Sequence, residues 1–332
     1  MKNIRVGNAI LENIIISQST FKGMKSATAY AYSSSANLGP GFDTLGLAHD
    51  ASRNKVTVTF VENSEGIELE LDCPNLPSSP EKNTASLAIK KILEGTGRTG
   101  RFRISVEDGI PIGLGLGCSG ASAAAAVVAV DSLLELGLSK DEKVRYAMLG
   151  ETASSGTPHA DNVAASIFGG LVAVESTNPM KVRPLPISGR LSFVTIVPKI
   201  RIKSKTRISR ALVPKDVTMV DHIEEIRHMS LLISGLSEGN SSLIRSGMND
   251  GIVEKARLKL FPFYPDIKKM ALAHDAAGVC ISGAGPSILM ACDSNTDVES
   301  VIQGAASVLQ KSKIDFSVYR SLPSGGAYVE EN

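Results

Sequence analysis

Residues 111–130 read PIGLGLGCSGASAAAAVVAV, a glycine-rich loop that leads directly into a run of alanine and valine. Glycine lets a backbone bend sharply and approach a ligand closely, and the small residues that follow predict a helix packed in a core. The start of a helix has unpaired N–H groups and partial positive charge, so the loop and helix together form an anion site, most often for phosphate. The strand-like residues 101–107 precede the loop, so the predicted cradle lies between a strand and a helix.

Three other interpretations of this loop are weaker. Residues 115–120, GLGCSG, match the dinucleotide fingerprint G-x-G-x-x-G, which also needs an acidic residue about 20 positions further on, after a second strand. The nearest candidate, Asp131, falls inside the predicted helix 121–135. A Walker loop requires a Lys-Ser or Lys-Thr pair that does not follow these glycines. A plain turn explains the alanines but not the alternating glycines and the serine, so we predict a lysine-free phosphate cradle with Ser119 at a metal.

The composition excludes several classes of protein. The 332 residues carry 35 Lys and Arg against 34 Asp and Glu, a formal net charge of +1, so no global field favours nucleic acid or an anionic membrane. The longest apolar run, residues 123–130, is far below the roughly 20 residues that span a bilayer, and residues 1–25 lack the features of a secretory signal. The cysteines, which show neither zinc nor disulfide spacing, are Cys73, Cys118, Cys280 and Cys292. We expect a cytoplasmic protein with reduced thiols.

Strands and helices alternate irregularly in both halves of the chain. In the first half we predict strands at 25–33, 55–61, 66–71 and 101–107 and helices at 84–94, 121–135, 140–151 and 157–168, with a turn-rich loop at 34–46. In the second half we predict strands at 171–175, 192–197, 278–281, 287–291 and 316–319 and helices at 218–235, 265–276 and 297–311. Prolines punctuate residues 179–189, where a domain boundary fits. This pattern predicts a two-domain α+β protein.

Four separated stretches point to one family. They are SANLGPGFD at 35–43, the glycine loop, HADNV at 159–163 and CISGAGPSI at 280–288. Together, and in this order, they resemble the motifs of the GHMP small-molecule kinases. The resemblance implies an N-terminal ribosomal-protein-like α+β domain at 25–185 and a C-terminal ferredoxin-like α/β sandwich at 186–332. Residues 1–24 would then be an N-terminal extension outside the core.

The same resemblance implies sites for ATP and Mg²⁺. Ser119 and Glu151 would hold the metal, which prefers one or two carboxylates together with phosphate oxygens; as a plain surface residue, Glu151 would instead end a helix in solvent. Asn83 would lie near the adenine, although it is equally suited to cap the helix that begins at Thr84. The residues expected to surround the nucleotide are Asn83, Pro111, Ile112, Gly113, Leu114, Gly115, Leu116, Gly117, Cys118, Ser119 and Gly120.

The stretches 35–43 and 159–163 are narrower and resemble the branch of the family that phosphorylates L-homoserine. An amino-acid acceptor needs an acid, a cation and a group that orients its hydroxyl. Asp43 suits the ammonium group and an arginine suits the carboxylate; Arg210 matches the family position, with Arg207 as a rival. The residues expected at the acceptor are Asn37, Asp43, His159, Asn162, Arg210, Arg257 and Gly283. The only partner expected is this small molecule, and the resemblance leaves a homodimer open.

The implied mechanism lacks a strong general base, because Asn162 occupies the position where related kinases have an aspartate, and the neighbouring Asp161 would point elsewhere on a helix. Three departures from the family pattern are Cys118 for serine, Gly120 for alanine and Ala165 for proline. Two alternatives remain open: a GHMP kinase for another alcohol, such as shikimate or mevalonate, and a non-catalytic metabolite sensor on the same fold. An intact Ser119 and Glu151 argue against the sensor.

Overall fold

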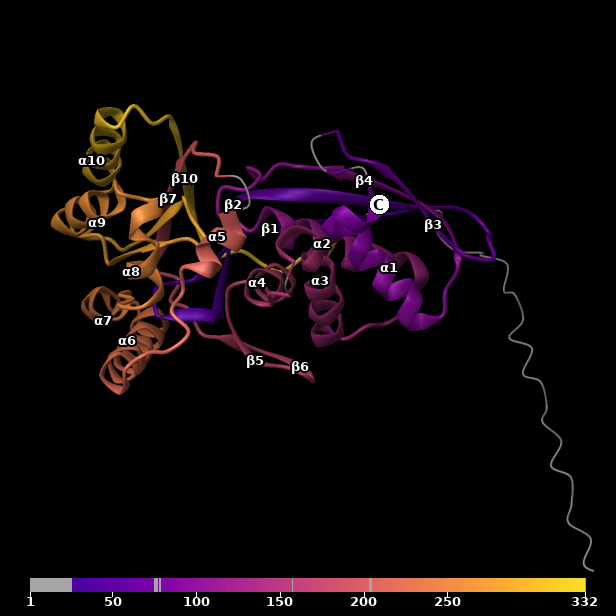
Figure 1. Cartoon of the computed structure of the whole chain (residues 1–332), viewed down its shortest axis with the longest axis horizontal. Coiled ribbons are helices and arrows are strands. Elements are labelled where there is room, and N and C mark those ends of the chain that lie inside the picture. Colours follow the sequence, from indigo (N-terminus) through magenta and orange to yellow (C-terminus); the bar gives the residue numbers. More distant parts are fainter. Residues whose placement is uncertain (1–25, 75–76, 78, 157, 203–204, 332) are drawn as a thin grey trace, which may run out of the picture.

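The computed structural model describes residues 26–74, 77, 79–156, 158–202 and 205–331. The predicted N-terminal extension, residues 1–24, lies outside this part. The described chain forms two sheets with their own helices, one built from the first half of the sequence and one from the second (Figure 1). The two-domain α+β fold predicted from the sequence is therefore confirmed, while the residue at which one domain ends and the next begins stays a prediction.

The first part is built on a twisted sheet. Among the described residues the sheet has seven strands, which are β1 (Ser26–Asn37), β2 (Gly41–Glu62), β3 (Ile67–Asp72), β4 (Gly100–Glu107), β5 (Leu171–Thr177), β6 (Met180–Leu185) and β11 (Tyr328–Val329). The main order is β11-β1-β2-β4-β3, and β5 pairs with β6 and with the first half of β2. Alternate residues of β4, including Phe102 and Ile104, are buried, so one face of the sheet lies on a core.

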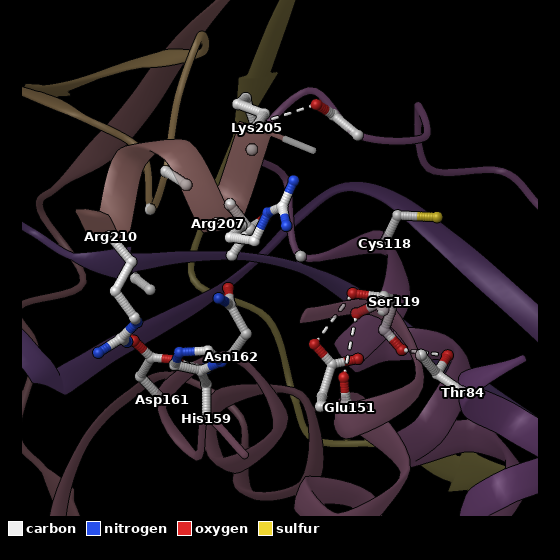
Figure 2. Close-up of a pocket in the computed structure, with 18 of the residues that line it drawn as sticks. Thr84, Cys118, Ser119, Glu151, His159, Asp161, Asn162, Lys205, Arg207 and Arg210 are labelled. Atoms are coloured by element: carbon white, nitrogen blue, oxygen red, sulfur yellow. Dashed lines mark hydrogen bonds between the residues drawn. The ribbon is translucent and has the colours of Figure 1, made fainter. Parts of the chain in front are cut away.

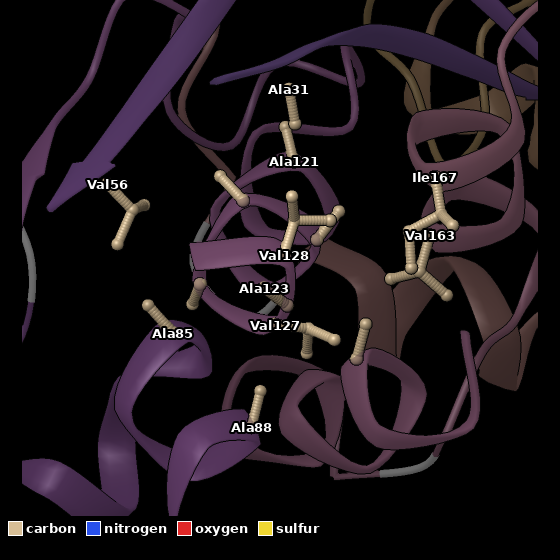
Figure 3. Packing of buried hydrophobic residues seen from close by; sticks show 14 of the residues in the cluster. Ala31, Val56, Ala85, Ala88, Ala121, Ala123, Val127, Val128, Val163 and Ile167 are labelled. Atoms are coloured by element: carbon tan, nitrogen blue, oxygen red, sulfur yellow. The ribbon is translucent and has the colours of Figure 1, made fainter. Parts of the chain in front are cut away.

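Four helices cover that face (Figure 1). They are α1 (Thr84–Thr96), α2 (Cys118–Leu134), α3 (Lys140–Ser155) and α4 (Asp161–Phe168), and the 3₁₀ turn Pro80–Lys82 precedes α1. Helix α2 is central, and almost all of its residues are buried. Small side chains such as Ala121 and Ala123 let it pack closely among α1, α4 and the sheet (Figure 3). This explains the alanine run, since a tightly enclosed helix has no room for larger residues.

The second part contains an antiparallel sheet. Its four strands, counted among the described residues, are β7 (Ser192–Pro198), β8 (Gly278–Ile281), β9 (Ile288–Cys292) and β10 (Phe316–Ser321), in the order β10-β7-β9-β8. Helices α9 (Tyr264–Ala273) and α10 (Val298–Lys311) share an apolar core with this sheet. The core includes Ile196 of β7, Ile267 of α9 and Val301 of α10. This is the ferredoxin-like arrangement of strands and helices expected for the C-terminal domain.

The remaining helices connect β7 to α9. They are α5 (Lys205–Ala211), α6 (Met219–Glu238), α7 (Ser241–Gly247) and α8 (Val253–Arg257), followed by the 3₁₀ turn Leu258–Leu260. In the part of the chain that the structure describes, no helix combines the length and the apolar character needed to cross a membrane. Helix α5 lies where the two parts of the molecule meet (Figure 1).

An apolar cluster joins the two parts. Leu38, Leu45 and Leu47 of the first part share it with Phe193 and Leu289 of the second part, and all five are almost fully buried. Burial of such side chains stabilises the contact by about 25 cal/mol per Å² of apolar surface removed from water. This shared cluster therefore holds the two parts of the molecule together.

Two predicted segments differ from the structure. The helix expected over 157–168 begins only at Asp161. Residues 34–46, which we expected to form a loop, are mostly strand: β1 continues to Asn37, β2 begins at Gly41, and the turn lies between them. Ser33, Ser34 and Ser35 are all fully buried. A strand that is buried on both faces shows no alternation of polar and apolar residues, so the sequence around Ser34 and Ser35 resembles a turn.

Candidate active site

A cavity of about 730 Å³ opens between the two parts of the molecule. Its walls come from the β1–β2 turn, the loop before α2, the end of α3, the start of α4, α5 and the β8–β9 turn. The predicted site residues that line it are Asn37, Asp43, Asn83, Ile112, Gly113, Gly115, Gly117, Cys118, Ser119, Glu151, His159, Asn162, Arg210, Arg257 and Gly283. Segments far apart in the sequence therefore converge on one place, as the resemblance implied.

Four predicted residues of the loop do not line this cavity: Pro111, Leu114, Leu116 and Gly120. Leu116 is buried, and its carbonyl accepts a hydrogen bond of 3.1 Å from the N–H of Ser34. Gly120 faces α4, where a Cβ atom would lie 3.2 Å from the Cβ of Asn162. Leu116 and Gly120 thus face the protein, and the contribution of all four residues to nucleotide binding stays a prediction.

The glycine loop requires glycine at two of its positions. Gly115 and Gly117 have φ angles of +92° and +69°, a region that L side chains rarely adopt. A Cβ on Gly115 would lie 2.7 Å from the carbonyl oxygen of Gly285, and one on Gly117 would lie 2.1 Å from Oγ of Ser34. The alternating glycines therefore let the loop pass between two neighbouring segments and still face the cavity.

Asn54 of β2 fixes both ends of this loop, and sequence reasoning missed it. Its Oδ1 accepts hydrogen bonds of 3.0 Å from the N–H groups of Gly109 and Ile110. Its Nδ2 donates to the carbonyl of Cys118 at 3.1 Å and to Oγ of Ser122 at 2.8 Å. Asn54 is fully buried and every part of its amide is used, so it sets where the loop begins and where α2 starts. A single asparagine within a predicted strand gives no signal of this role.

Cys118 begins α2 with its thiol turned inward. Nδ2 of Asn54 lies 3.5 Å from its Sγ, and burial raises the pKa of the thiol to about 12. The side chain is therefore a neutral thiol that receives a weak hydrogen bond. The departure from the family's serine changes an inward contact of the loop, while the backbone N–H of Cys118 stays at the start of the helix.

Ser119 and Glu151 meet at the floor of the cavity (Figure 2). Oγ of Ser119 donates a hydrogen bond of 3.0 Å to Oε2 of Glu151, and Thr84 donates to the carbonyl of Ser119 at 3.1 Å. Burial raises the pKa of Glu151 to about 7. Glu151 is only 8% exposed, so it is not the solvated helix-end residue of the alternative interpretation. A hydroxyl beside a buried carboxylate at the end of a glycine loop is a fitting donor pair for a divalent cation.

Asn83 is a helix cap as well as a cavity residue. Its Oδ1 accepts from the N–H groups of Ala85 at 3.0 Å and Ser86 at 3.3 Å, the first turn of α1. Its Nδ2 donates to the carbonyl of Pro77 at 3.3 Å. The capping role considered for this residue is therefore present, and its amide is already occupied within the protein.

An ion pair marks the opposite end of the cavity. Nη2 of Arg210 lies 2.7 and 2.9 Å from the two carboxylate oxygens of Asp43. The guanidinium groups of Arg210 and Arg257 both lie over the ring of Phe42, at 5.2 and 5.3 Å from its centroid. The sequence offered Arg210 and Arg207 as alternatives here; both line the cavity, and Arg210 is the one that pairs with Asp43.

Backbone carbonyls of the β8–β9 turn complete this end. Nη1 of Arg257 donates to the carbonyl of Gly283 at 2.9 Å, and Nδ2 of Asn37 donates to the same oxygen at 3.1 Å. Oδ1 of Asn37 in turn accepts from the N–H of Asp43 at 3.2 Å. The three predicted residues Asn37, Arg257 and Gly283 are thus held together by one carbonyl group.

His159 and Asp161 lie beside Arg210, and Asn162 lies between this end and Ser119 (Figure 2). Asn162 accepts a hydrogen bond of 2.9 Å at Oδ1 from the hydroxyl of Ser34. Asp161 is buried, and burial followed by the charge of Asp43 raises the pKa of its carboxyl to about 6. Its Oδ1 accepts a hydrogen bond of 2.7 Å from the N–H of Asn162. Contrary to the expectation that it points elsewhere, Asp161 lines the cavity.

Lys205 is the second site residue that sequence reasoning missed. It begins α5, is 8% exposed and lines the cavity. Its Nζ donates to the carbonyl of Gly113 at 2.8 Å and to the carbonyl of Gly285. It stands in the basic stretch RIKSKTRISR, whose charges are not distinguished by spacing, so nothing in the sequence separates it from a surface lysine.

Comparisons with known proteins agree with this geometry. The family model of the GHMP kinases N terminal domain matches residues 83–170, and that of the GHMP kinases C terminal domain matches residues 232–311. The chain is 47% identical to a homoserine kinase of Saccharolobus islandicus and 45% identical to one of Thermoplasma acidophilum, over 92% and 91% of this chain and 99% and 96% of those proteins.

A solved structure is similar over the same length. The crystal structure of homoserine kinase from Cytophaga hutchinsonii is 32% identical in sequence, with a TM-score of 0.84, and the match covers 92% of this chain and 98% of that one. A mevalonate kinase of L. major, 16% identical with a TM-score of 0.69, shares the fold. The similarity thus extends through both parts of the molecule and across the cavity.

Proposed function

The chain belongs to the homoserine kinases of the GHMP kinase family, and on this premise we propose that it transfers the γ-phosphoryl group of ATP to the side-chain hydroxyl of L-homoserine. The products are ADP and O-phospho-L-homoserine. The cavity supports this proposal because it has a glycine loop suited to a triphosphate at one end and paired charges suited to an amino acid at the other.

The Asp43–Arg210 pair is the observation that carries the choice of acceptor. The two groups lie 2.7 Å apart at the cavity wall, and their charges are the complements of an ammonium group and a carboxylate. When a zwitterionic amino acid binds, the internal pair is replaced by two pairs with the ligand: Asp43 with its ammonium group and Arg210 with its carboxylate. A planar guanidinium also binds both oxygens of a carboxylate. Shikimate and mevalonate have no ammonium group and would leave Asp43 without a partner.

The glycine loop and the start of α2 support ATP as the donor. Gly113, Gly115 and Gly117 have the backbone freedom for close approach, and α2 begins directly after them. The positive end of a helix favours phosphate groups. Ser119 and Glu151 would hold Mg²⁺, which when bound would neutralise charge on the phosphate oxygens. Among the described residues no cluster of three or more His, Cys, Asp or Glu could hold a metal, which fits a cation held mainly by phosphate.

Positioning explains the reaction without a strong base. Phosphoryl transfer depends on in-line placement and charge stabilisation more than on covalent chemistry. The amide of Asn162 orients the acceptor hydroxyl, and an amide cannot take its proton. We propose that the proton leaves late, to phosphate or to water. The charges of Arg210 and Arg257 hold the acceptor at a fixed distance from the loop.

A substrate panel tests the function. ADP release is measured with ATP and Mg²⁺ in the presence of homoserine, shikimate, mevalonate or galactose. We expect turnover with homoserine and none that depends on the other alcohols. Turnover with shikimate alone would contradict the acceptor, and homoserine binding without any turnover would favour the metabolite sensor.

The proposed product places the enzyme on the route to threonine, since phosphorylation converts the homoserine hydroxyl into a leaving group. We propose a cytoplasmic setting. All four cysteines are buried free thiols, which agrees with a reducing compartment.

A further inference from the structure

Lys205 is a buried lysine in the wall of the cavity. It is 8% exposed, and lysine is almost never this buried without a charged partner. In the described part of the chain no carboxylate contributes to its electrostatic surroundings; the one charge that does is the like charge of Arg257. Burial of an unpaired ammonium group is costly, so the site is arranged for an anion that the protein itself does not provide.

The position of Lys205 indicates which anion this is. Its ammonium group contacts the carbonyls of Gly113, in the glycine loop, and Gly285, in the turn of the second domain. Those two contacts use two of its three N–H donors. Figure 2 shows Arg210 beside Asp161, and Arg207 between Lys205 and Arg210 with its guanidinium group turned toward Cys118 and Ser119. Its hydrogen bond to Gly113 makes Lys205 the basic residue of α5 that is held against the glycine loop.

The glycine loop itself contains no positively charged side chain. Residues 108–122 contain neither lysine nor arginine, whereas a Walker loop carries its own lysine to the phosphates. Arg210 is paired with Asp43, and Arg257 donates to the carbonyls of Ser209 and Gly283. Both lie at the acceptor end. Arg207 and Lys82 also line the cavity, but both are exposed, so Lys205 is the buried basic residue beside the glycine loop.

We propose that Lys205 binds the phosphates of the nucleotide, with its ammonium group anchored on the carbonyls of Gly113 and Gly285 and its third N–H donated to a phosphate oxygen. A lysine of the second domain thereby takes the place of the lysine absent from the loop. This inference rests on the proposed use of ATP.

Binding of ADP and of adenosine, both without Mg²⁺, separates a phosphate contact from a purely structural one. For Lys205→Met we expect affinity for ADP to fall about tenfold, the size of one lost charge-assisted hydrogen bond, and affinity for adenosine to stay within about twofold. Lys205→Gln keeps a donor for the carbonyls but removes the charge, so it should also lose affinity for ADP. If the methionine variant does not fold, the glutamine variant tests whether Lys205 contacts phosphate. Lys205→Arg should recover part of the affinity. Lys215→Met, an exposed lysine outside the cavity, is the control.

A proton balance gives a second measurement. Burial, followed by the charge of Arg257, lowers the pKa of Lys205 to about 7, so at pH 8 most of the free protein has a neutral amine here. A bound phosphate favours the ammonium form, and calorimetry in buffers of different ionisation enthalpy should show proton uptake when ADP binds. The uptake should be absent in Lys205→Met.

The outcomes are distinct. Equal loss of ADP and adenosine affinity would mean that Lys205 only joins the two segments, and unchanged ADP affinity would mean that it has no role; either overturns the inference while homoserine phosphorylation by the wild type would still support the function. If the wild type binds ADP through Lys205 but does not phosphorylate homoserine, the inference holds and the proposed function fails.

Discussion

The hydroxyl of Ser34, on β1, donates a hydrogen bond of 2.9 Å to Oδ1 of Asn162, on α4. In this contact the amide oxygen accepts, which leaves the NH₂ group available as a donor to a ligand. Asn162 therefore acts as a donor toward a ligand. A donor can orient the oxygen of an alcohol, but it cannot accept the proton of that alcohol.

Asn162→Ala should lower kcat by about one to two orders of magnitude, because a misplaced acceptor is sensitive to small shifts. KM for ATP should change less than kcat, since the proposed contact of the amide is with the acceptor hydroxyl. Steady-state kinetics with both substrates varied provide the measurement. Asn162→Asp serves as the matched variant: if a base were limiting, it would be faster than wild type, and we expect it to be slower. Full turnover in Asn162→Ala would show that the amide does not orient the hydroxyl.

Asp161→Asn tests whether the neighbouring acid is a base. The carboxyl is buried beside the cavity, and its pKa is raised to about 6. These two properties make it the candidate for a general base. Loss of a general base typically lowers kcat by about 10²- to 10⁴-fold. We expect kcat of Asp161→Asn to fall far less than this. Loss of turnover in a variant that folds and binds both substrates would contradict the mechanism without a base.

Ser119→Ala and Cys118→Ser form a pair of neighbouring substitutions with opposite expected results. Ser119 contacts Glu151 at the proposed metal site, so its loss should lower turnover by about tenfold or more and shift the Mg²⁺ dependence to higher concentration. Cys118→Ser keeps a side chain that can accept from Asn54 and should retain near wild-type turnover. Titration of activity with Mg²⁺ measures both. A harmless Ser119→Ala would place the metal elsewhere.

Arg210→Met should raise KM for homoserine by at least about tenfold and leave KM for ATP unchanged, because a charge-assisted pair with the carboxylate is lost. Arg207→Met is the comparison, since that side chain lines the same cavity without pairing with Asp43. The assignment would be reversed if Arg207→Met raised KM for homoserine and Arg210→Met did not.

His49 makes stability depend on pH. It is fully buried between the hydroxyls of Ser33 and Ser35, and burial lowers its pKa to about 4, below the unfolded value of about 6.5. Below pH 6.5 the unfolded chain binds a proton at this histidine and the folded chain does not. The free energy of unfolding therefore falls as the pH falls. Between pH 7 and pH 5 the titration of His49 lowers the free energy of unfolding by about 2 kcal/mol.

The measurement is the free energy of unfolding in denaturant at pH 7 and pH 5, compared between wild type and His49→Gln. Asp161 and Glu151 act in the opposite direction, because their raised pKa values add stability as pH falls. The difference between the two proteins isolates the histidine. An identical pH dependence in both would show that His49 titrates normally in the folded state.

The parts of this protein that were predictable have local causes. The glycine loop and α2 follow from composition alone, since glycines at positive φ and a run of small residues are needed within one short segment. The meeting of Ser119 with Glu151, and of Asp43 with Arg210, came from the resemblance to a family. Neither pair is close in sequence, so no periodicity could have indicated it.

The parts that were missed depend on tertiary contacts. Asn54 is one polar residue in a strand, and its role exists only because β2 passes beside both ends of the glycine loop. Lys205 has ordinary neighbours in sequence and becomes distinctive only when burial removes its water. The serines before Asn37 were taken for a loop because a segment enclosed on both faces shows no pattern.

The glycine loop belongs to the first domain by sequence, yet part of its hydrogen bonding comes from the second. Ser287 donates to the carbonyl of Leu114 from its N–H at 3.1 Å and from its hydroxyl at 2.6 Å, and Ser282 donates to the carbonyl of Gly115 at 2.6 Å. An isolated first domain would leave these carbonyls without their donors. A chimera that exchanged the second domain for that of a distant relative would rebuild the proposed nucleotide site as well as the proposed acceptor site. If ATP binds at the glycine loop, the smallest unit that recombination or protein engineering can transplant with that site intact is the pair of domains.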